Sequence, residues 1–223
     1  MADIFSEVEE SLRHERYQRM ARRYGPVALA LAIFIVVAVA GREGWIAYKN
    51  RAAAQSSDAF AAAQTDLEAG RLDAAMSGFA ELSEDGAEGY RALAKMQEAA
   101  TAAVTGSLEE GARLFDEAAT LTNDPLIGGM ARLKAAYLLA DRIEVDALEA
   151  RLTPLMTRGA PYELAARELL GAAALSAGEL ARAREAYVYL TVALEAPGGV
   201  QRRAEEALAV IAAAEASQTD EEG

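Results

Sequence analysis

The stretch AGELARAREAY, residues 177–187, has the spacing of a turn followed by the second helix of a helical hairpin. Gly178 marks the turn, because glycine adopts the positive φ that ends a helix at little cost. Ala183, five positions later, is small enough for two helices to approach closely. Tyr187 lies one helical turn beyond Ala183 on the same face, where its ring can fill the gap to a neighbouring hairpin. The stretch therefore predicts one helix–turn–helix unit.

Three further stretches repeat this spacing: AGRLDAAMSGF from Ala69, TGSLEEGARLF from Thr105 and ADRIEVDALEA from Ala140. The turn residues are 36, 35 and 37 positions apart: Gly70, Gly106, Asp141 and Gly178. The small and aromatic residues are present in the first two copies but not in the third: Ala75 and Phe79, Gly111 and Phe115, then Asp146 and Ala150. A period of this size is typical of stacked helical hairpins, which bury their apolar faces against one another.

Composition supports a helical chain. Hydrophobic residues make up 52 %, mostly alanine, and aromatic residues only 6 %; alanine loses no side-chain entropy in a helix. We expect an all-α fold, with an N-terminal transmembrane helix followed by an α-solenoid of about four hairpins and a capping helix. Start and stop signals place helices at about 42–69, 71–83, 87–104, 107–121, 126–140, 144–157, 162–176, 179–195 and 199–215. The expected segments are a short amphipathic helix at 1–23, the membrane helix and its flank at 24–48, the repeats at 49–215 and a disordered acidic tail at 216–223.

The membrane helix is predicted from the 18 residues between Tyr24 and Gly41, which carry no charge. A helix of that length spans roughly 27 Å, close to the ~30 Å of a hydrocarbon core. A core helix of a soluble domain would show a polar face, and this stretch shows none. Its strongly apolar residues are Val27, Leu29, Leu31, Ile33, Phe34, Ile35, Val36, Val37 and Val39. Aromatic residues that favour the lipid–water boundary flank it: Tyr24, Trp45 and Tyr48.

The flanking charges predict the orientation. Five arginines precede the span (Arg13, Arg16, Arg19, Arg22 and Arg23) and three cations follow it (Arg42, Lys49 and Arg51). Because positive charge stays in the cytoplasm, we expect a cytoplasmic N-terminus, and in a bacterial inner membrane a periplasmic repeat domain. An export signal is the alternative, since Ala38-Val39-Ala40 fits a small-x-small cleavage pattern.

The repeats resemble the tetratricopeptide repeat superfamily, whose second helix has a turn glycine, an alanine five positions later and an aromatic nine positions later. With the single span, SDAFAAAQ, GYRALAKMQEA and LLGAAALSAGELARAREAY make the chain similar to the bacterial single-span tetratricopeptide proteins that are ancillary subunits of the Sec translocon. The resemblance implies a scaffold at the translocon whose partners are translocon subunits, a periplasmic chaperone and client segments. A released cell-envelope repeat protein, or one assembling with other envelope machinery, is the alternative.

The residues themselves argue against catalysis. The chain has no Cys, and its one His, His14, precedes the span, so the repeats lack the commonest general base and metal ligand. We expect no enzyme, metal site, cofactor or small-molecule substrate. The net charge of −13 is concentrated in the repeats and repels nucleic acid.

What remains is a concave groove lined by the first helices of the hairpins, which in such solenoids binds peptide segments. Tyr, Met and Arg favour interfaces. The groove candidates are Tyr90, Arg91, Met96, Met130, Arg132, Tyr137, Tyr162 and Arg167.

Overall fold

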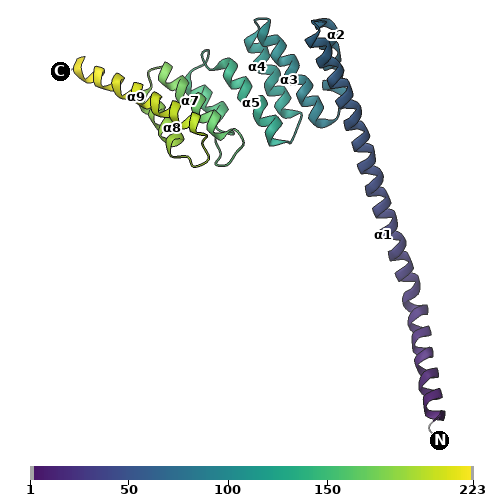
Figure 1. Cartoon of the computed structure of the whole chain (residues 1–223). Helices are drawn as coiled ribbons and strands as arrows, with labels where there is room; N and C mark the ends of the chain where they lie inside the picture. Colours follow the sequence, from purple (N-terminus) through teal and green to yellow (C-terminus); the bar gives the residue numbers. More distant parts are fainter. Residues whose placement is uncertain (1–2, 222–223) are drawn as a thin grey trace. The chain divides into compact units, whose positions relative to one another are not determined.

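The computed structural model describes the backbone of residues 3–221, and side-chain environments at residues 22, 24, 26 and 29–217. Over residues 3–221 it contains nine helices and no strand, which confirms the predicted all-α fold. The helices are α1 (Asp3–Glu68), α2 (Leu72–Asp85), α3 (Glu88–Val104), α4 (Leu108–Thr120), α5 (Pro125–Leu139), α6 (Val145–Leu152), α7 (Glu163–Ser176), α8 (Leu180–Val192) and α9 (Gly198–Glu221) (Figure 1).

The chain divides into two compact units, Met1–Ala52 and Ala53–Gly223. The first unit consists of the greater part of α1. The sequence predicted two separate segments here, 1–23 and 24–48, but α1 continues through both as one helix from Asp3. Pro26 lies inside this helix rather than in its first turn. Proline is tolerated inside membrane helices because local adjustments satisfy the freed carbonyl group.

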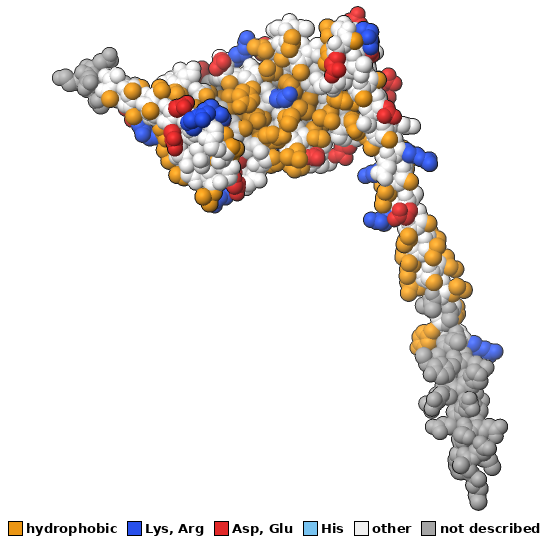
Figure 2. Space-filling view, in the orientation of Figure 1, with side chains coloured by type: hydrophobic (Ala, Val, Ile, Leu, Met, Phe, Trp, Pro, Cys, Tyr) orange, Lys and Arg blue, Asp and Glu red, His pale blue; other side chains and the backbone are white. Residues whose placement is uncertain are grey.

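Part of α1 is a candidate membrane span by length and composition, within Leu29–Glu68. The described apolar side chains of this span are exposed on the surface of the first unit, as Figure 2 shows for the visible face. Eight of the predicted span residues are between 52 % and 68 % exposed: Leu29, Leu31, Ile33, Phe34, Ile35, Val36, Val37 and Val39. Val27 lies outside the described side chains. An apolar helix with no protein packed around it is consistent with a lipid environment.

The second unit, Ala53–Gly223, is the solenoid. The end of α1 pairs with α2, α3 with α4, α5 with α6 and α7 with α8, and α9 packs on α8 (Figure 1). The sequence located α2, α3, α4, α5, α7 and α8 to within a few residues, whereas α6 ends at Leu152 rather than near residue 157. Pro154 follows, and it lacks the backbone N–H that would continue the helical hydrogen bonds.

Glycines end the first helix of three hairpins. Gly70, Gly106 and Gly178 have φ of 74°, 100° and 77°. At Gly178 the N–H groups of residues 178 and 179 donate to the carbonyls of Leu175 (3.1 Å) and Ala174 (2.8 Å), the double hydrogen bond of a Schellman motif. The third hairpin turns at Asp141 without such a glycine, and no described non-glycine residue has positive φ.

Small residues allow the helices within a hairpin to pack closely. Ala75, Ala183 and Phe79 are fully buried, and Phe115 and Tyr187 are 3 % and 6 % exposed. A Cβ on Gly111 would lie 3.0 Å from both the Ala103 Cβ and the Ala99 carbonyl oxygen, so α3 and α4 touch almost backbone to backbone there.

Ion pairs join consecutive hairpins. Four of them connect residues 33 to 36 positions apart, one repeat period: Arg142 with Glu109, Arg151 with Asp116, Arg182 with Asp146 and Arg203 with Glu168. Three of the four involve the third hairpin, α5–α6, whose sequence lacks the turn glycine and the aromatic residue.

The C-terminal helix is longer than expected. α9 continues to Glu221 and includes most of the segment predicted as a disordered tail. The sequence from Ala212 to Ala216 is alanine-rich and contains no glycine or proline, so nothing in it ends the helix.

Candidate interaction surface

An exposed apolar stripe runs along α5. Leu126, Met130 and Tyr137 are 56 %, 40 % and 53 % exposed. At about 100° per residue the three lie within about 40° of one another on the helix. The opposite face of α5 is the packed one, with Ala131 and Ala135 fully buried. The solenoid therefore leaves three large apolar side chains in solvent on one side of a helix that is well packed on the other.

This face continues from α5 over α7 to α9. Arg203 of α9 makes a bidentate pair with Glu168 of α7, at 2.6 and 2.9 Å. Partial burial and the charge of Glu168 raise the pKa of Tyr137, and Arg203 opposes them, so these three side chains lie together. Val210, 57 % exposed, follows Arg203 by seven positions and so shares its side of α9. We call this the first-helix face: Leu126, Met130, Tyr137, Glu168, Arg203 and Val210.

The first-helix face has the composition of a binding surface. Its exposed large side chains are apolar or aromatic, and its two charges neutralise one another across neighbouring helices. Figure 2 shows hydrophobic side chains gathered over the middle of the solenoid on the side in view. Contiguous exposed apolar surface with few charges is characteristic of sites that bind another protein.

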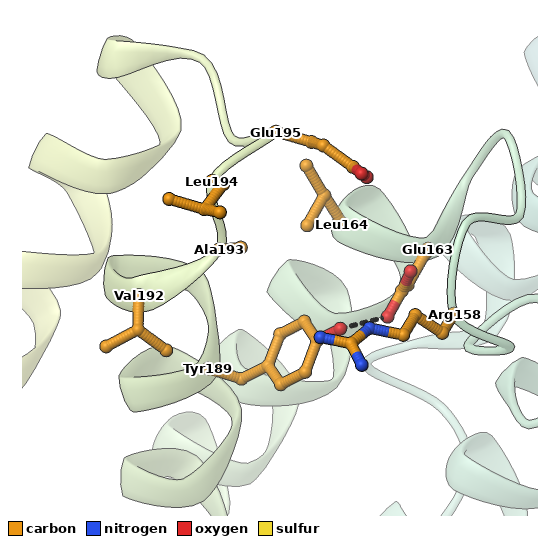
Figure 3. A pocket seen from close by; sticks show the side chains of 8 residues that line it. All are labelled: Arg158, Glu163, Leu164, Tyr189, Val192, Ala193, Leu194 and Glu195. Carbon is orange, nitrogen blue, oxygen red and sulfur yellow. Dashed lines mark hydrogen bonds between the residues drawn. The ribbon is translucent and has the colours of Figure 1, made fainter.

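A pocket of about 210 Å³ lies beside the start of α7, lined by Arg158, Glu163, Leu164, Tyr189, Val192, Ala193, Leu194 and Glu195 (Figure 3). Its polar floor is Glu163, which is only 4 % exposed. The Glu163 carboxylate accepts hydrogen bonds from the Gly159 N–H (2.7 Å), from Arg167 (3.3 Å) and from the Tyr189 hydroxyl. Figure 3 shows Tyr189 and Glu163 pointing toward one another with Arg158 beside them.

The Glu163 cluster joins parts of the fourth hairpin, α7–α8, to the loop before it. Burial alone would raise the pKa of Glu163, but the hydrogen bonds from Tyr189, Gly159 and Arg167 outweigh it and lower that pKa. The Arg167 guanidinium also lies 3.8 Å over the Tyr189 ring and donates to the Met156 carbonyl at 3.1 Å. The cluster thus ties the loop before α7 to α8, and its carboxylate is already satisfied by the protein.

The structure places two of the eight groove candidates on the first-helix face, Met130 and Tyr137. Met96 is buried, at 7 % exposure, because its side of α3 packs on α4 and α5. Arg91 donates to the Ser83 carbonyl near the end of α2, and Arg167 belongs to the Glu163 cluster. Arg132 is exposed, but it lies about 240° from Leu126 around α5 and therefore outside the first-helix face.

The two candidate tyrosines that remain are partly packed against the core. The Tyr90 ring lies 6.2 Å from that of Phe60, and the Tyr162 ring covers Gly129. Leu126 and Val210 were missed by sequence reasoning. The spacing of Leu126 from Met130 and Tyr137 alone would not have revealed the stripe, because Leu133 falls on the same side of the helix and is buried, at 8 % exposure.

Within the described part of the chain, no cluster of His, Cys, Asp and Glu has the arrangement of a metal site. The apolar and aromatic side chains of the first-helix face can bury their surface against a partner.

The repeat architecture agrees with a comparison against known families. A family model described as a tetratricopeptide repeat-like domain matches residues 19–217. Searches among curated proteins and among solved structures found no match. The match covers most of the chain and includes every hairpin described above, and the chain therefore belongs to the family of tetratricopeptide repeat-like domains.

Proposed function

We propose that the chain is a membrane-anchored scaffold for protein–protein interactions, and specifically an ancillary subunit of the Sec translocon that links it to periplasmic chaperones and emerging clients. The observation that carries the proposal is the combination of one uncovered apolar helix with a repeat domain whose first-helix face is apolar and exposed. Tetratricopeptide-like domains typically bind proteins and are not catalytic, and the proposed role needs no turnover.

The membrane part of the proposal rests on α1. Its uncharged stretch is long enough to cross a bilayer, and the side chains from Leu29 to Gly41 are exposed. Five arginines precede the stretch and three cations follow it. That asymmetry favours a cytoplasmic N-terminus and a periplasmic solenoid in a bacterial inner membrane.

The binding part of the proposal rests on the first-helix face. An apolar segment of a partner laid across Leu126, Met130 and Tyr137 would remove their exposed surface from water, which is the main driving force for association. Beside Tyr137, the Glu168 carboxylate can accept hydrogen bonds from backbone N–H groups of that segment, and the Arg203 guanidinium can donate to its C=O groups. A face of this kind suits unfolded or partly folded client segments, whose apolar residues are accessible.

Site-specific photo-crosslinking in cells tests the binding face. A photoreactive residue at Met130 or Tyr137 is expected to capture protein partners, whereas the same residue at Arg132 is not. Arg132 is the matched control, because it is exposed on the same helix but lies about 240° from Leu126. Equal capture at all three positions, or none at Met130 and Tyr137, would contradict binding through this face.

A second set of positions tests the translocon assignment. Photoreactive residues at Leu31 and Val37, within the apolar stretch of α1, are expected to crosslink to translocon subunits. Capture of other membrane proteins only would refute the Sec assignment and leave the scaffold proposal standing.

The alternative is a repeat protein released into the cell envelope, favoured by the small residues of Ala38-Val39-Ala40 ahead of Gly41. N-terminal sequencing of the mature protein separates the two. An N-terminus at Met1 or Ala2 supports the anchor, and one at Gly41 supports release.

A further inference from the structure

We propose that Arg42, Trp45 and Lys49 form a binding site for the phosphate group of an anionic phospholipid, at the membrane surface on the side of the solenoid. This inference rests on the proposed membrane anchoring and adds a lipid ligand to it. All three residues belong to the first compact unit, Met1–Ala52.

The three side chains share one face of α1. Their spacing of three and then four residues places them within about 60° of one another around the helix. The Lys49 ammonium lies 5.8 Å from the centre of the Trp45 ring, and the Tyr48 ring stacks with the Trp45 ring, with ring centres 6.0 Å apart. The result is a cation, an indole and a second cation in a row along the helix.

The site lies at the right depth for a headgroup. Arg42 is the first charged residue after the uncharged stretch that ends at Gly41. Arg42 and Lys49 are about 10 Å apart along the axis, at 1.5 Å per residue. The headgroup layer on each side of a bilayer is about 5–8 Å deep, less than this separation, and the long side chains of Arg42 and Lys49 bend toward it from either end while Trp45 lies between them. The Trp45 ring, 61 % exposed, then lies at the boundary that tryptophan prefers.

The charge of the site is available to a ligand. Lys49 has no carboxylate partner among the residues whose contacts are described, and Arg42 makes only a 3.4 Å contact with its exposed neighbour Glu43. Glu43 is one position further along the helix and so points about 100° away from Arg42. Two cations on one face without a strong internal partner attract an anion, and a lipid phosphate is the anion present at that depth.

Arg51 provides a matched control. It carries the same charge, lies close to Lys49 in the sequence and has no described carboxylate partner, but it is nine residues from Arg42 and so lies about 180° around the helix. A general attraction between a basic segment and an anionic membrane would depend on Arg51 about as much as on Lys49, which is only two residues away. A site formed by one face of the helix would not.

The test uses the fluorescence of Trp45, the single tryptophan of the chain. The full-length protein is reconstituted into phosphatidylcholine bilayers that contain either brominated phosphatidylglycerol or brominated phosphatidylcholine, and quenching gives the relative binding constant of the two lipids beside Trp45. We expect native protein to prefer phosphatidylglycerol. Arg42→Gln and Lys49→Gln should each lower that preference by about fivefold, and Arg51→Gln by less than about twofold.

The outcomes separate this site from the anchor itself. Quenching by neither lipid would contradict both the membrane anchor and the site, whereas equal quenching by both would keep the anchor and overturn the site. An equal loss of preference in Arg51→Gln would also overturn it, in favour of diffuse attraction. Glycerol phosphate added to the solution should not compete, and relief of quenching at millimolar concentration would show that the site takes a free phosphate instead of a lipid.

Discussion

Replacing Gly129 by alanine should destabilise the solenoid, whereas the same change at its neighbour Gly128 should stabilise it. Both glycines are buried in α5 and neither has a positive φ. They differ in what a Cβ would meet. At Gly128 the nearest atom is the Ala119 carbonyl oxygen at 3.5 Å, an ordinary contact. At Gly129 the Cβ would lie 2.7 Å from Cδ2 and 3.0 Å from Cε2 of the Tyr162 ring.

The magnitudes follow from two competing effects. Alanine is favoured over glycine inside a helix by about 0.5–1 kcal/mol, and this gain applies at both positions. Carbon atoms in contact normally stay about 3.5–4.0 Å apart, so the Tyr162 ring must move by about 1 Å when Gly129 is replaced. Overpacking of this kind costs about 1–3 kcal/mol. The two variants should therefore differ by about 1–3 kcal/mol, or about 2–12 °C in Tm for a domain of this size.

Thermal unfolding of the full-length protein in mild detergent, followed by circular dichroism at 222 nm, measures this difference. Tyr162→Ala supplies the internal check, because it removes the ring that the new methyl group strikes. In that background Gly129→Ala should stabilise the protein, as Gly128→Ala does in the native one. The reasoning fails if Gly129→Ala is as stable as Gly128→Ala, or if its cost persists without the Tyr162 ring.

Three further changes probe the turns, the buried carboxylate and the ion pairs. Gly178→Ala should cost about 1–2 kcal/mol in the same melting assay, since alanine is strained at the φ of 77° found there; an unchanged Tm would contradict the left-handed turn. Because the folded pKa of Glu163 is lowered from 4.5, its stabilisation is present above pH 4.5 and is lost as pH falls through the lowered pKa; Tm should therefore drop on acidification in native protein, and drop less in Glu163→Gln. Raising sodium chloride from about 0.05 to 0.5 M should speed hydrogen exchange in α6 more than in α2, whose described residues make no ion pair, because screening weakens the Arg151–Asp116 and Arg182–Asp146 pairs of α6; equal acceleration would argue against a special role of ion pairs in the third hairpin.

The helices could be predicted from the sequence because glycine and proline mark their ends. Gly70, Gly106 and Gly178 each end a helix by adopting a conformation that other residues avoid. Asp124 is an N-cap whose side chain accepts the Leu126 N–H at 2.8 Å, and Pro125 after it is the first residue of α5. These are local effects, and a local reading of the sequence detects them.

The loop before α7 could not be predicted in the same way. Its conformation depends on Glu163, which reaches back to the Gly159 N–H and across to Tyr189 of the following helix. From sequence alone Glu163 is one of many acidic residues near a helix start, where a carboxylate favours the helix dipole. Only the packing of α8 against α7 turns it into a buried carboxylate with three donors.

The first-helix face also depends on packing between hairpins. A Tyr, Met or Arg in a first helix can face the neighbouring hairpin, the second helix or solvent, and residue type does not distinguish these cases. Met96 and Met130 show this, since the first is buried in the core and the second is 40 % exposed. Helical spacing does not supply the missing information either, because Leu133 shares the side of α5 that carries Leu126 and Tyr137 and is buried, at 8 % exposure.

The third hairpin shows how a degenerate repeat keeps its place in the stack. Asp141 replaces the turn glycine, Asp146 the small residue and Ala150 the aromatic one, so the aromatic contact of the other repeats is absent, although Leu148 and Leu152 of α6 are fully buried. Asp146 instead pairs with Arg182 of the next hairpin at 2.7 Å, while Arg142 and Arg151 pair with the previous one. Each exposed pair contributes about 0–1 kcal/mol, so three together offset the loss of one aromatic contact of about 0.5–1.5 kcal/mol. Because the partners lie one period apart, these pairs also fix the register in which the hairpins stack, and they allow the motif to be lost from this repeat without the solenoid being interrupted.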